Sequence, residues 1–360
     1  MTMGRSIGGL WIAGLLFIAS TGPSFADLVR FEAKGAPKER LVIYSSTDVE
    51  RIEFLIRAFQ QKAPGIAIDY YELDTLDIFQ RVVDETDAGI PTADLALSSA
   101  MDLQIKLVND GYSAPYFSEE TESLPGWANW RDEAFGFTYE PAVIIYNRAL
   151  APELKQVDSR FELAKTLSEQ SSNLRGRVAT YDPKHSGLGF LFGTQDAVHS
   201  EDFWYLARSL GDNDVQLMTS SASMIDKVAS GNALIAYNVL GSYALARERQ
   251  NPDLAITIPK DYGLVMSRIA IATKTARNPR AAGQFIDFLL SRDGQELIAG
   301  PASLYAIRSD IQGDATARKL QETAEGPLIP IHLGPGLLVY LDKIKRKDFL
   351  NRWQRAMDGK

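Results

Sequence analysis

Apolar residues recur along the chain at two spacings, which predicts strands and helices in turn. The run LVIYSSTD, residues 41–48, is a short apolar stretch ending in small hydroxylated residues, which indicates a buried strand entering a loop. Residues 49–65 then carry apolar side chains at helical spacing from Ile52 to Phe59, and Pro64 ends that pattern. The N-terminal half therefore begins with a strand followed by a helix.

The same order repeats in the next fifty residues. A strand is expected at 66–73, a helix at 76–89, and a strand, a Ser-Ser turn and a second helix within 93–111. Strands that alternate with helices in this way predict a parallel sheet with helices on both faces.

Two β-rich runs interrupted by proline predict places where the chain changes sheet. Residues 135–147 contain Pro141, and residues 254–273 contain Pro259. Because a central strand cannot easily hold proline, each run is interpreted as a crossing between two sheets. Between them we expect helices at 161–170, 201–210, 220–230 and 241–250 and strands at 176–182 and 233–238; single amphipathic helices are expected at 279–300 and 334–357.

The predicted fold is α/β, with two lobes that each contain a mostly parallel sheet flanked by helices and are joined by two β crossings. We expect residues 27–140 to form the first part of lobe 1, 141–262 to form lobe 2, and 263–360 to form the rest of lobe 1 with the C-terminal helices. A mature chain of this length is also more easily built as two lobes than as one core.

The N-terminus predicts export. Arg5 precedes an apolar run from about residue 7 to residue 20, and the segment closes on Ser24-Phe25-Ala26. These features are typical of a signal peptide, residues 1–26, cut after Ala26, and the apolar run is shorter than the roughly 20 residues of a membrane span. The expected location is the periplasm.

Composition narrows the functional classes. The chain has no cysteine, which excludes disulfides, thiolate metal sites and thiol nucleophiles. Its formal net charge of −8 argues against nucleic acid as a partner, although a local pocket can still attract a small anion. The three histidines are scattered, so we expect no metal site. We also expect no cofactor and a monomeric protein.

Small polar residues stand where predicted strands end, and ligands of open parallel sheets bind at those ends. We expect contacts from the first two such loops, from the stretch YDPKHSGLGF, from the end of the strand ALIAYN, and from the first crossing. In that order the candidates are Ser45, Ser46, Thr47, Ser98, Ser99, His185, Ser186, Gly187, Gly189, Asn238 and Tyr139. The alternative for the serines and Thr47 is helix capping, and for the others an ordinary turn or core position.

His185 and Ser186, with Asp182 nearby, invite comparison with a catalytic triad. Triad residues meet through the fold rather than by adjacency, and no G-x-S-x-G motif surrounds this serine. No catalytic residue is predicted, and an exported hydrolase is the least favoured function. We instead expect Ser186, Gly187 and Gly189 to start a helix whose N–H groups face an anion.

At this level of detail the chain resembles the periplasmic solute-binding proteins of ABC importers, in the group of ferric-iron, sugar-phosphate and phosphoglycerate binders. The resemblance is carried by LVIYSSTD, ADLALSSAMDLQIKLVNDGY, YDPKHSGLGF, GNALIAYNVLGSYALARE and NPRAAGQFIDFLLSRDGQELI. It implies a two-lobe fold that closes over its ligand by hinge bending and docks on a membrane permease. Some relatives instead present their ligand to the periplasmic domain of a sensor kinase.

The subgroup decides the expected ligand. Ferric relatives carry an adjacent Tyr-Tyr pair shortly after the position of Asn238, where this chain has Leu240 and Gly241 and then a single Tyr243. They also tend to have a histidine where this chain has Asp48. The resemblance therefore favours a small anionic solute such as a sugar phosphate or phosphoglycerate, with Tyr243 as a further ligand contact and ferric iron as the alternative.

Overall fold

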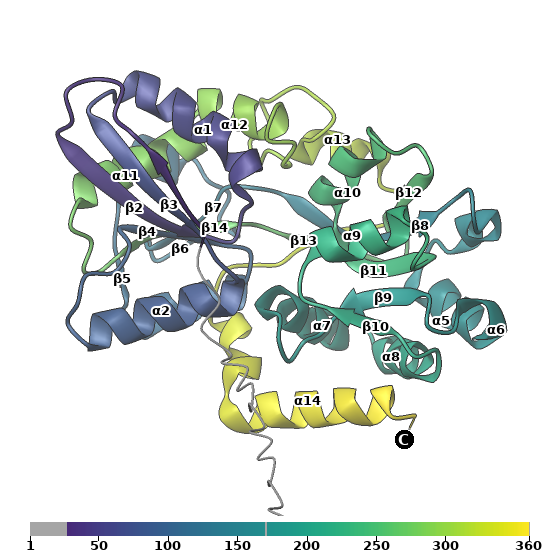
Figure 1. The fold of residues 1–360 in the computed structure, drawn as a ribbon. Coiled ribbons are helices and arrows are strands. Elements are labelled where there is room, and N and C mark those ends of the chain that lie inside the picture. Colours follow the sequence, from purple (N-terminus) through teal and green to yellow (C-terminus); the bar gives the residue numbers. More distant parts are fainter. Residues whose placement is uncertain (1–26, 170, 360) are drawn as a thin grey trace, which may run out of the picture.

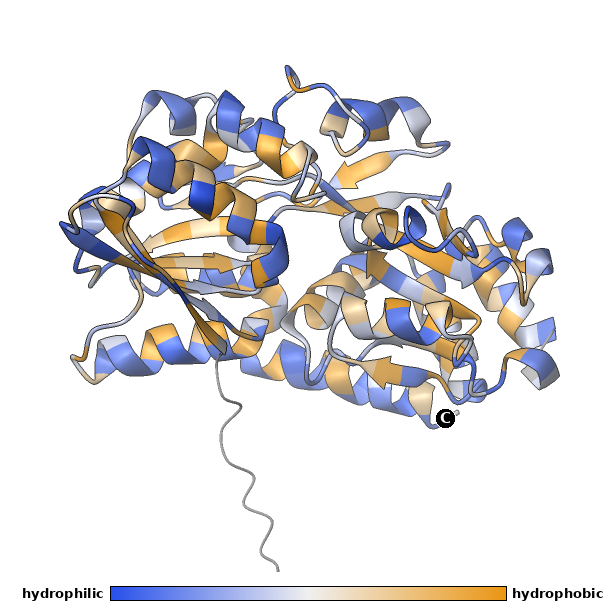
Figure 2. Cartoon of the chain, turned by 45° about the horizontal axis from the view of Figure 1, so that its top comes forward, coloured by the Kyte–Doolittle hydropathy of each residue, from blue (hydrophilic) through white to orange (hydrophobic). Residues whose placement is uncertain are grey.

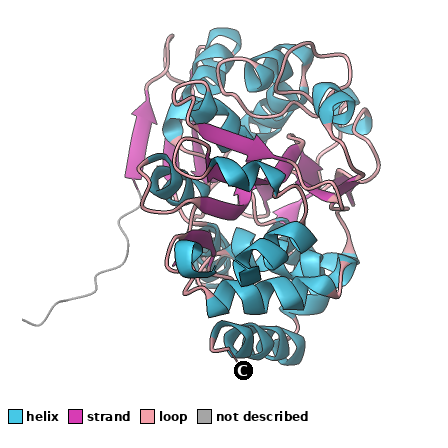
Figure 3. Cartoon of the chain, turned by 90° about the vertical axis from the view of Figure 1, so that its right-hand side faces the viewer, coloured by secondary structure: helices cyan, strands magenta, loops and turns pink. Residues whose placement is uncertain are grey.

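The computed structural model describes residues 27–169 and 171–359. The expected signal peptide and its cut after Ala26 lie outside these residues. None of the described helices combines the length and apolar composition needed to cross a bilayer. Strands occupy the centre of the molecule and helices surround them, as the side view in Figure 3 shows.

The strands of the described chain form two sheets (Figure 1). The first has the order β1-β3-β2-β4-β14-β7-β6, with β5 beside β14. Its strands are β1 (Asp27–Phe31), β2 (Glu39–Ser45), β3 (Ile66–Glu72), β4 (Leu95–Ser98), β5 (Ser113–Ala114), β6 (Asn129–Trp130), β7 (Ala134–Gly136) and β14 (Ile269–Thr273). The strands β3, β2 and β4 are parallel, and β14 returns antiparallel to β4.

The second sheet has the order β10-β9-β11-β8-β13-β15, with β12 beside β8. Its strands are β8 (Glu140–Asn147), β9 (Val178–Tyr181), β10 (Gln216–Met218), β11 (Ile235–Leu240), β12 (Leu254–Thr257), β13 (Gly263–Met266) and β15 (Leu328–Pro330). Here β10, β9 and β11 are parallel, and the crossing strand β8 is antiparallel to its neighbours. We call the two sheets with their helices lobe 1 and lobe 2.

Helices cover both sheets, with apolar faces inward and polar faces outward (Figure 2). In lobe 1 these are α1 (Val49–Lys62), α2 (Thr75–Asp87), α3 (Met101–Asn109), α4 (Glu119–Glu122), α11 (Pro279–Leu290) and α12 (Arg292–Ala299). In lobe 2 they are η1 (Pro152–Gln156), α5 (Arg160–Glu169), α6 (Ser171–Leu174), α7 (Gly187–His199), α8 (Asp202–Asp212), α9 (Ser221–Ala229) and α10 (Gly241–Glu248). The helix α13 (Ala317–Thr323) packs in a cluster with β13 and β15 of the second sheet. The chain ends with η2 (Pro335–Leu341) and α14 (Lys343–Met357).

Each of the two β-rich runs contains a crossing, but only Pro141 stands beside one, because Pro259 lies between β12 and β13 of the same sheet. The chain passes from β7 of lobe 1 to β8 of lobe 2 through residues 137–139, and returns from β13 to β14 through residues 267–268. Pro141 nevertheless lies inside β8, so the expectation that such a strand excludes proline is wrong. Pairing of β8 with β11 stops at Ala142, so Pro141 has a strand neighbour only on the side of β13.

Two predicted helices are each divided in the structure. The helix expected at 279–300 breaks at Ser291, whose hydroxyl accepts the Gly294 N–H at 3.2 Å and starts α12. A Cβ at Gly294 would stand 1.9 Å from the Phe288 carbonyl oxygen, so glycine permits the close turn. The helix expected at 334–357 is η2 followed by α14, because the Asp342 carboxylate caps α14.

A buried carboxyl group lies in the first turn of α3. The side chain of Asp102 is only 3% exposed and accepts the Leu103 N–H at 2.9 Å. Burial raises the pKa of Asp102 to about 7, although the Leu103 N–H and the charge of Arg346 on α14 both favour the ionised form. The folded chain therefore holds this proton more tightly than the unfolded chain.

This arrangement predicts how Asp102→Asn changes the pH dependence of stability. The pKa of this group is higher in the folded state than the 3.8 of an ordinary Asp, so its contribution to stability is lost as pH rises from about 4 to about 7. The isosteric amide removes that loss. The melting temperature of Asp102→Asn relative to wild type should rise between pH 5 and pH 8, measured by differential scanning calorimetry, whereas exposed Asp84→Asn should show no such rise. An equal difference at both pH values would contradict the argument.

Candidate functional site

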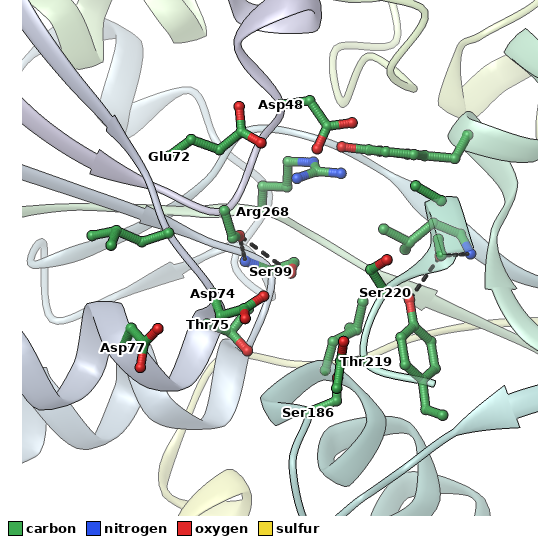
Figure 4. Close-up of a pocket in the computed structure, with 18 of the residues that line it drawn as sticks. Asp48, Glu72, Asp74, Thr75, Asp77, Ser99, Ser186, Thr219, Ser220 and Arg268 are labelled. Atoms are coloured by element: carbon green, nitrogen blue, oxygen red, sulfur yellow. Dashed lines mark hydrogen bonds between the residues drawn. The ribbon is translucent and has the colours of Figure 1, made fainter. Parts of the chain in front are cut away.

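A cavity of about 660 Å³ lies between the two lobes (Figure 4). Loops and helix starts of both lobes line it, together with one residue of the return crossing. The lining residues are Ser46, Asp48, Val49, Glu50, Glu72, Leu73, Asp74, Thr75, Asp77, Ser99, Tyr181, Ser186, Leu188, Thr219, Ser220, Ser221, Ala222, Leu240, Tyr243 and Arg268. The volume is that of a small-molecule site.

The lobe 1 wall is built from the ends of parallel strands and the helices that follow them. Ser46 and Ser99 follow β2 and β4, and the Ser46 hydroxyl accepts the Ser99 N–H at 3.1 Å. Asp48 and Asp74 precede α1 and α2 as N-cap residues, and neither carboxylate bonds an N–H of its helix. Both carboxylates remain directed to the cavity (Figure 4).

The lobe 2 wall is built from the N-termini of three helices. Ser186 caps α7 by accepting the Gly189 N–H at 3.1 Å, and Ser220 caps α9 by accepting the Ser223 N–H at 3.2 Å. Tyr243 lies in the first turn of α10. None of these three helices carries an acidic residue in its first turn, so the positive ends of their dipoles are not offset by their own side chains.

The back of the cavity is the hinge itself. Arg268, in the return crossing, donates from Nε to Glu140 at 2.8 Å and from one terminal nitrogen to Thr47 at 2.9 Å. The side chains of Arg268 and Glu140 are 1% and 0% exposed. Glu140 also accepts hydrogen bonds from Ser242 of α10 and Thr138 of the first crossing, so one buried ion pair joins both crossings and both lobes.

Two buried tyrosines face this space. Tyr181 pairs its hydroxyl with that of Ser221 at 2.7 Å, and burial raises the pKa of Tyr181. Burial also raises the pKa of Tyr243 to about 12, partly opposed by Arg268, and the Arg51 guanidinium stacks 4.0 Å from the Tyr243 ring centre. Both phenols are therefore neutral at physiological pH and can donate a hydrogen bond to a ligand.

Of the residues expected to contact ligand, the structure brings Ser46, Ser99, Ser186 and Tyr243 to the cavity wall. The hydroxyls of Ser45 and Ser98 instead accept backbone N–H groups of their own loops, and Thr47 holds Arg268.

The remaining expected residues lie away from the cavity. Tyr139 packs against Trp127 in a buried cluster, and Gly189 is bonded to the Ser186 cap. His185 has a 61% exposed side chain and pairs with Asp182 at 2.6 Å. Asn238 donates to buried Asp196 at 2.7 Å, behind the lobe 2 wall.

Gly187 makes a contact between the lobes rather than lining the cavity. Its N–H donates to the Thr75 hydroxyl at 3.2 Å. A Cβ here would stand 2.7 Å from that hydroxyl oxygen and 3.1 Å from the Ala100 Cβ, both on lobe 1. Glycine therefore lets α7 meet lobe 1 closely.

Several lining residues escaped sequence reasoning. Thr219 and Ser220 precede a helix that has no glycine in its first turn. In the sequence they therefore resemble an ordinary helix cap. Arg268 stands in a β-rich run, and no local pattern distinguishes it from a surface arginine. The lobe 1 carboxylates resemble first-turn residues of ordinary helices.

Comparison with known proteins assigns the family. Residues 55–324 match the family described as bacterial extracellular solute-binding protein. The chain belongs to this family. The protein is thus an extracellular solute-binding component of an ABC transporter, and the expected two-lobe fold is confirmed.

Solved structures agree. The substrate binding protein of an ABC transporter from Agrobacterium tumefaciens is 37% identical with a TM-score of 0.87, covering 93% of this chain and 100% of that chain. Iron-bound HitA from Pseudomonas aeruginosa (TM-score 0.71) and AfuA from Actinobacillus pleuropneumoniae with exogenous fructose-6-phosphate bound (TM-score 0.73) are each 20% identical. Each match covers 89% of this chain and 99% of the other, and at this identity shows the fold alone.

A relative from Haemophilus influenzae, itself an uncharacterized protein, is 26% identical over 285 residues, which are 72% of this chain and 75% of that protein. The family fits the expected location outside the cytoplasm.

The hinge pair predicts a strong and specific stability effect. Arg268→Met or Glu140→Gln leaves one buried charge without its partner, which should lower the free energy of unfolding by about 3–5 kcal/mol in urea denaturation. The double variant should recover part of this loss. Arg57→Met, which breaks the exposed pair with Glu53, should cost about 1 kcal/mol or less. Single variants as stable as Arg57→Met would contradict the role given to the hinge pair.

The Gly187 contact predicts a change in lobe closure. Gly187→Ala should push α7 from lobe 1 and shift the unliganded protein to a more open shape, with a larger radius of gyration in small-angle X-ray scattering. Gly126→Ala is the control, because no atom stands within 4 Å of a Cβ added there. If the two variants scatter identically, this contact does not control closure.

Proposed function

We propose that this protein captures a small organic anion, such as a sugar phosphate or phosphoglycerate, in the cavity between the lobes and delivers it to the permease of an ABC importer. The observation that carries the proposal is the lobe 2 wall. Three helices, α7, α9 and α10, start there without an acidic residue in the first turn. Helix N-termini supply backbone N–H groups and a positive dipole end, which together suit a phosphate.

Side chains of the same wall support this choice. Ser186, Ser220 and Ser221 bring hydroxyl groups, and Tyr243 brings a neutral phenol that is 7% exposed. Arg268 adds a cation at the back of the cavity, although Glu140 already compensates its charge. The AfuA structure, which holds fructose-6-phosphate, is an example of this fold with such a ligand.

Ferric iron is the alternative ligand, and HitA is an example of this fold with iron. The positions expected for paired tyrosines hold Leu240 and Gly241, and Leu240 presents an apolar side chain to the cavity. Tyr181 is bonded to Ser221, so a metal would have to displace that bond to reach its phenol oxygen. These features favour an organic anion over iron.

Closure follows from the position of the cavity. A ligand that contacts both walls binds the closed arrangement better than the open one and shifts the population towards it. The two crossing segments, residues 137–139 and 267–268, are short. Arg268 lines the cavity and also bonds residues at the first crossing. We infer that closure presents the permease with one rigid surface made of both lobes.

A thermal-shift screen tests the proposed ligand class. Glucose 6-phosphate, fructose 6-phosphate, 3-phosphoglycerate, inorganic phosphate and ferric citrate are compared. At 100 times its dissociation constant a true ligand adds about 2.7 kcal/mol to the free energy of unfolding. We expect an organic phosphate to raise the melting temperature, and Tyr243→Phe to weaken its binding without changing the unliganded protein.

The control for Tyr243→Phe is Tyr205→Phe, since Tyr205 is exposed on α8 and far from the lining residues. Stabilisation by ferric citrate alone, or by none of the phosphates, would overturn the proposal.

A further inference from the structure

The two walls of the cavity differ sharply in charge. Lobe 1 contributes five carboxylates, and lobe 2 contributes hydroxyls and helix N-termini but no charged side chain. The five are Asp48, Glu50, Glu72, Asp74 and Asp77. Among the described lining residues the only cationic side chain is Arg268, and its charge is compensated by Glu140. The cavity is therefore negative on one wall.

Four of these carboxylates form no ion pair with a described residue, although Asp48 lies near enough to Arg268 for the two charges to interact. No Lys, Arg or His of the described chain forms an ion pair with Asp48, Glu50, Asp74 or Asp77, whereas carboxylates elsewhere on lobe 1 such as Asp69 and Glu85 do. Glu72 is engaged by the Val49 N–H at 2.8 Å. Asp48, Glu50, Asp74 and Asp77 are thus available to a ligand.

Asp74 shows the cost of this arrangement most clearly. It is the N-cap residue of α2, yet its carboxylate bonds no N–H of that helix. The residue is exposed to solvent overall, yet the partial burial of its carboxyl group, and then the negative charge of Asp77, raise the pKa of Asp74. A group held in this state is stabilised when a positive charge arrives, and further destabilised when only a negative one does.

A second observation indicates that the cavity is built to be filled. Tyr243 is 7% exposed and lines the cavity, and its hydroxyl has no hydrogen-bond partner among the described residues. The ring is buried while the hydroxyl is open to the cavity, so this group is expected to bond a ligand or water. It belongs to the lobe 2 wall, in the first turn of α10.

Neutral hydroxyls of a sugar could also donate to the carboxylates. They would leave four negative charges facing one another in a closing cavity, together with the added negative charge of a phosphate. A protonated amine offsets that charge and donates hydrogen bonds as well.

We propose that the preferred ligand is a zwitterionic organic phosphate, with its phosphate on the helix N-termini of lobe 2 and its ammonium group between Asp74 and Asp77 of lobe 1. This rests on the proposed function and specifies the ligand class of the same cavity. The phosphate then complements the lobe 2 wall, and the ammonium group complements the lobe 1 wall. Only a ligand that carries both groups makes charged contacts with both lobes. A simple sugar phosphate satisfies only the lobe 2 half.

Matched ligand pairs test the inference by isothermal titration calorimetry. Glucosamine 6-phosphate is compared with glucose 6-phosphate, and 2-aminoethyl phosphate with ethyl phosphate. In at least one pair we expect the amine to bind at least tenfold more tightly. Asp74→Asn should abolish the preference, and asparagine is as good an N-cap as aspartate, so α2 keeps its start. Asp84→Asn removes a charge from the same helix outside the cavity and should leave the preference unchanged.

The outcomes separate this inference from the proposed function. Equal or weaker binding of the amine in both pairs overturns the zwitterion assignment while leaving phosphate capture intact. A preference that persists in Asp74→Asn, or is lost equally in Asp84→Asn, overturns the role of Asp74. Ethanolamine alone is titrated as a further ligand. If it binds while none of the four phosphates does, phosphate capture is wrong and both proposals are overturned.

Discussion

The buried ion pair between Arg268 and Glu140 is the interaction on which the arrangement of the two lobes depends. Arg268 lies in the return crossing and Glu140 directly follows the first crossing, and together they contact Thr47 of lobe 1 and Ser242 of lobe 2. Two charges without solvent are tolerable only when both are well bonded, and here every contact comes from a segment that must be in place for the lobes to meet. The position of the hinge thus depends on these buried hydrogen bonds and this ion pair as much as on apolar packing.

The site follows from the same topology. Parallel strands of each sheet end towards the other lobe, so the helices that follow them bring their N-termini to one cavity. The lobe 1 helices carry acidic residues at these ends and the lobe 2 helices do not. A repeated structural unit therefore yields two chemically different walls, and the difference arises from a few side chains rather than from the fold.

Sequence patterns predicted the fold further than the site. Alternating strands and helices were sufficient to predict the two lobes. The two β-rich runs were sufficient to predict both crossings, although Pro259 does not stand at one. The breaks at Ser291 and Asp342 were missed because apolar periodicity continues across each of them while a single capping side chain starts a new helix. Only tertiary contacts, such as Gly294 against Phe288, show that the turn is required.

For the site, the position of a residue in a polar loop did not predict whether its side chain faces the cavity. At the end of β2, Ser45 and Thr47 are buried while Ser46 between them lines the cavity. The identity of these residues gives no sign of which one does so. Arg268 could not be found because its partners lie 128 and 221 residues away along the chain. Charge balance within a cavity is likewise visible only when both walls are assembled.

The C-terminal segment limits how the lobes can move. After β15 the chain reaches lobe 1, where η2 packs on α3, and then returns to lobe 2, where α14 packs on α8 (Figure 1). The η2–α14 connection is therefore a further covalent link between the lobes, besides the two β crossings and the passages into and out of β15. Two bodies joined at neighbouring points can both bend and twist, whereas a link away from that axis resists twisting. The expected motion is a single-axis rotation, in which Asp342, between η2 and α14, acts as the second pivot.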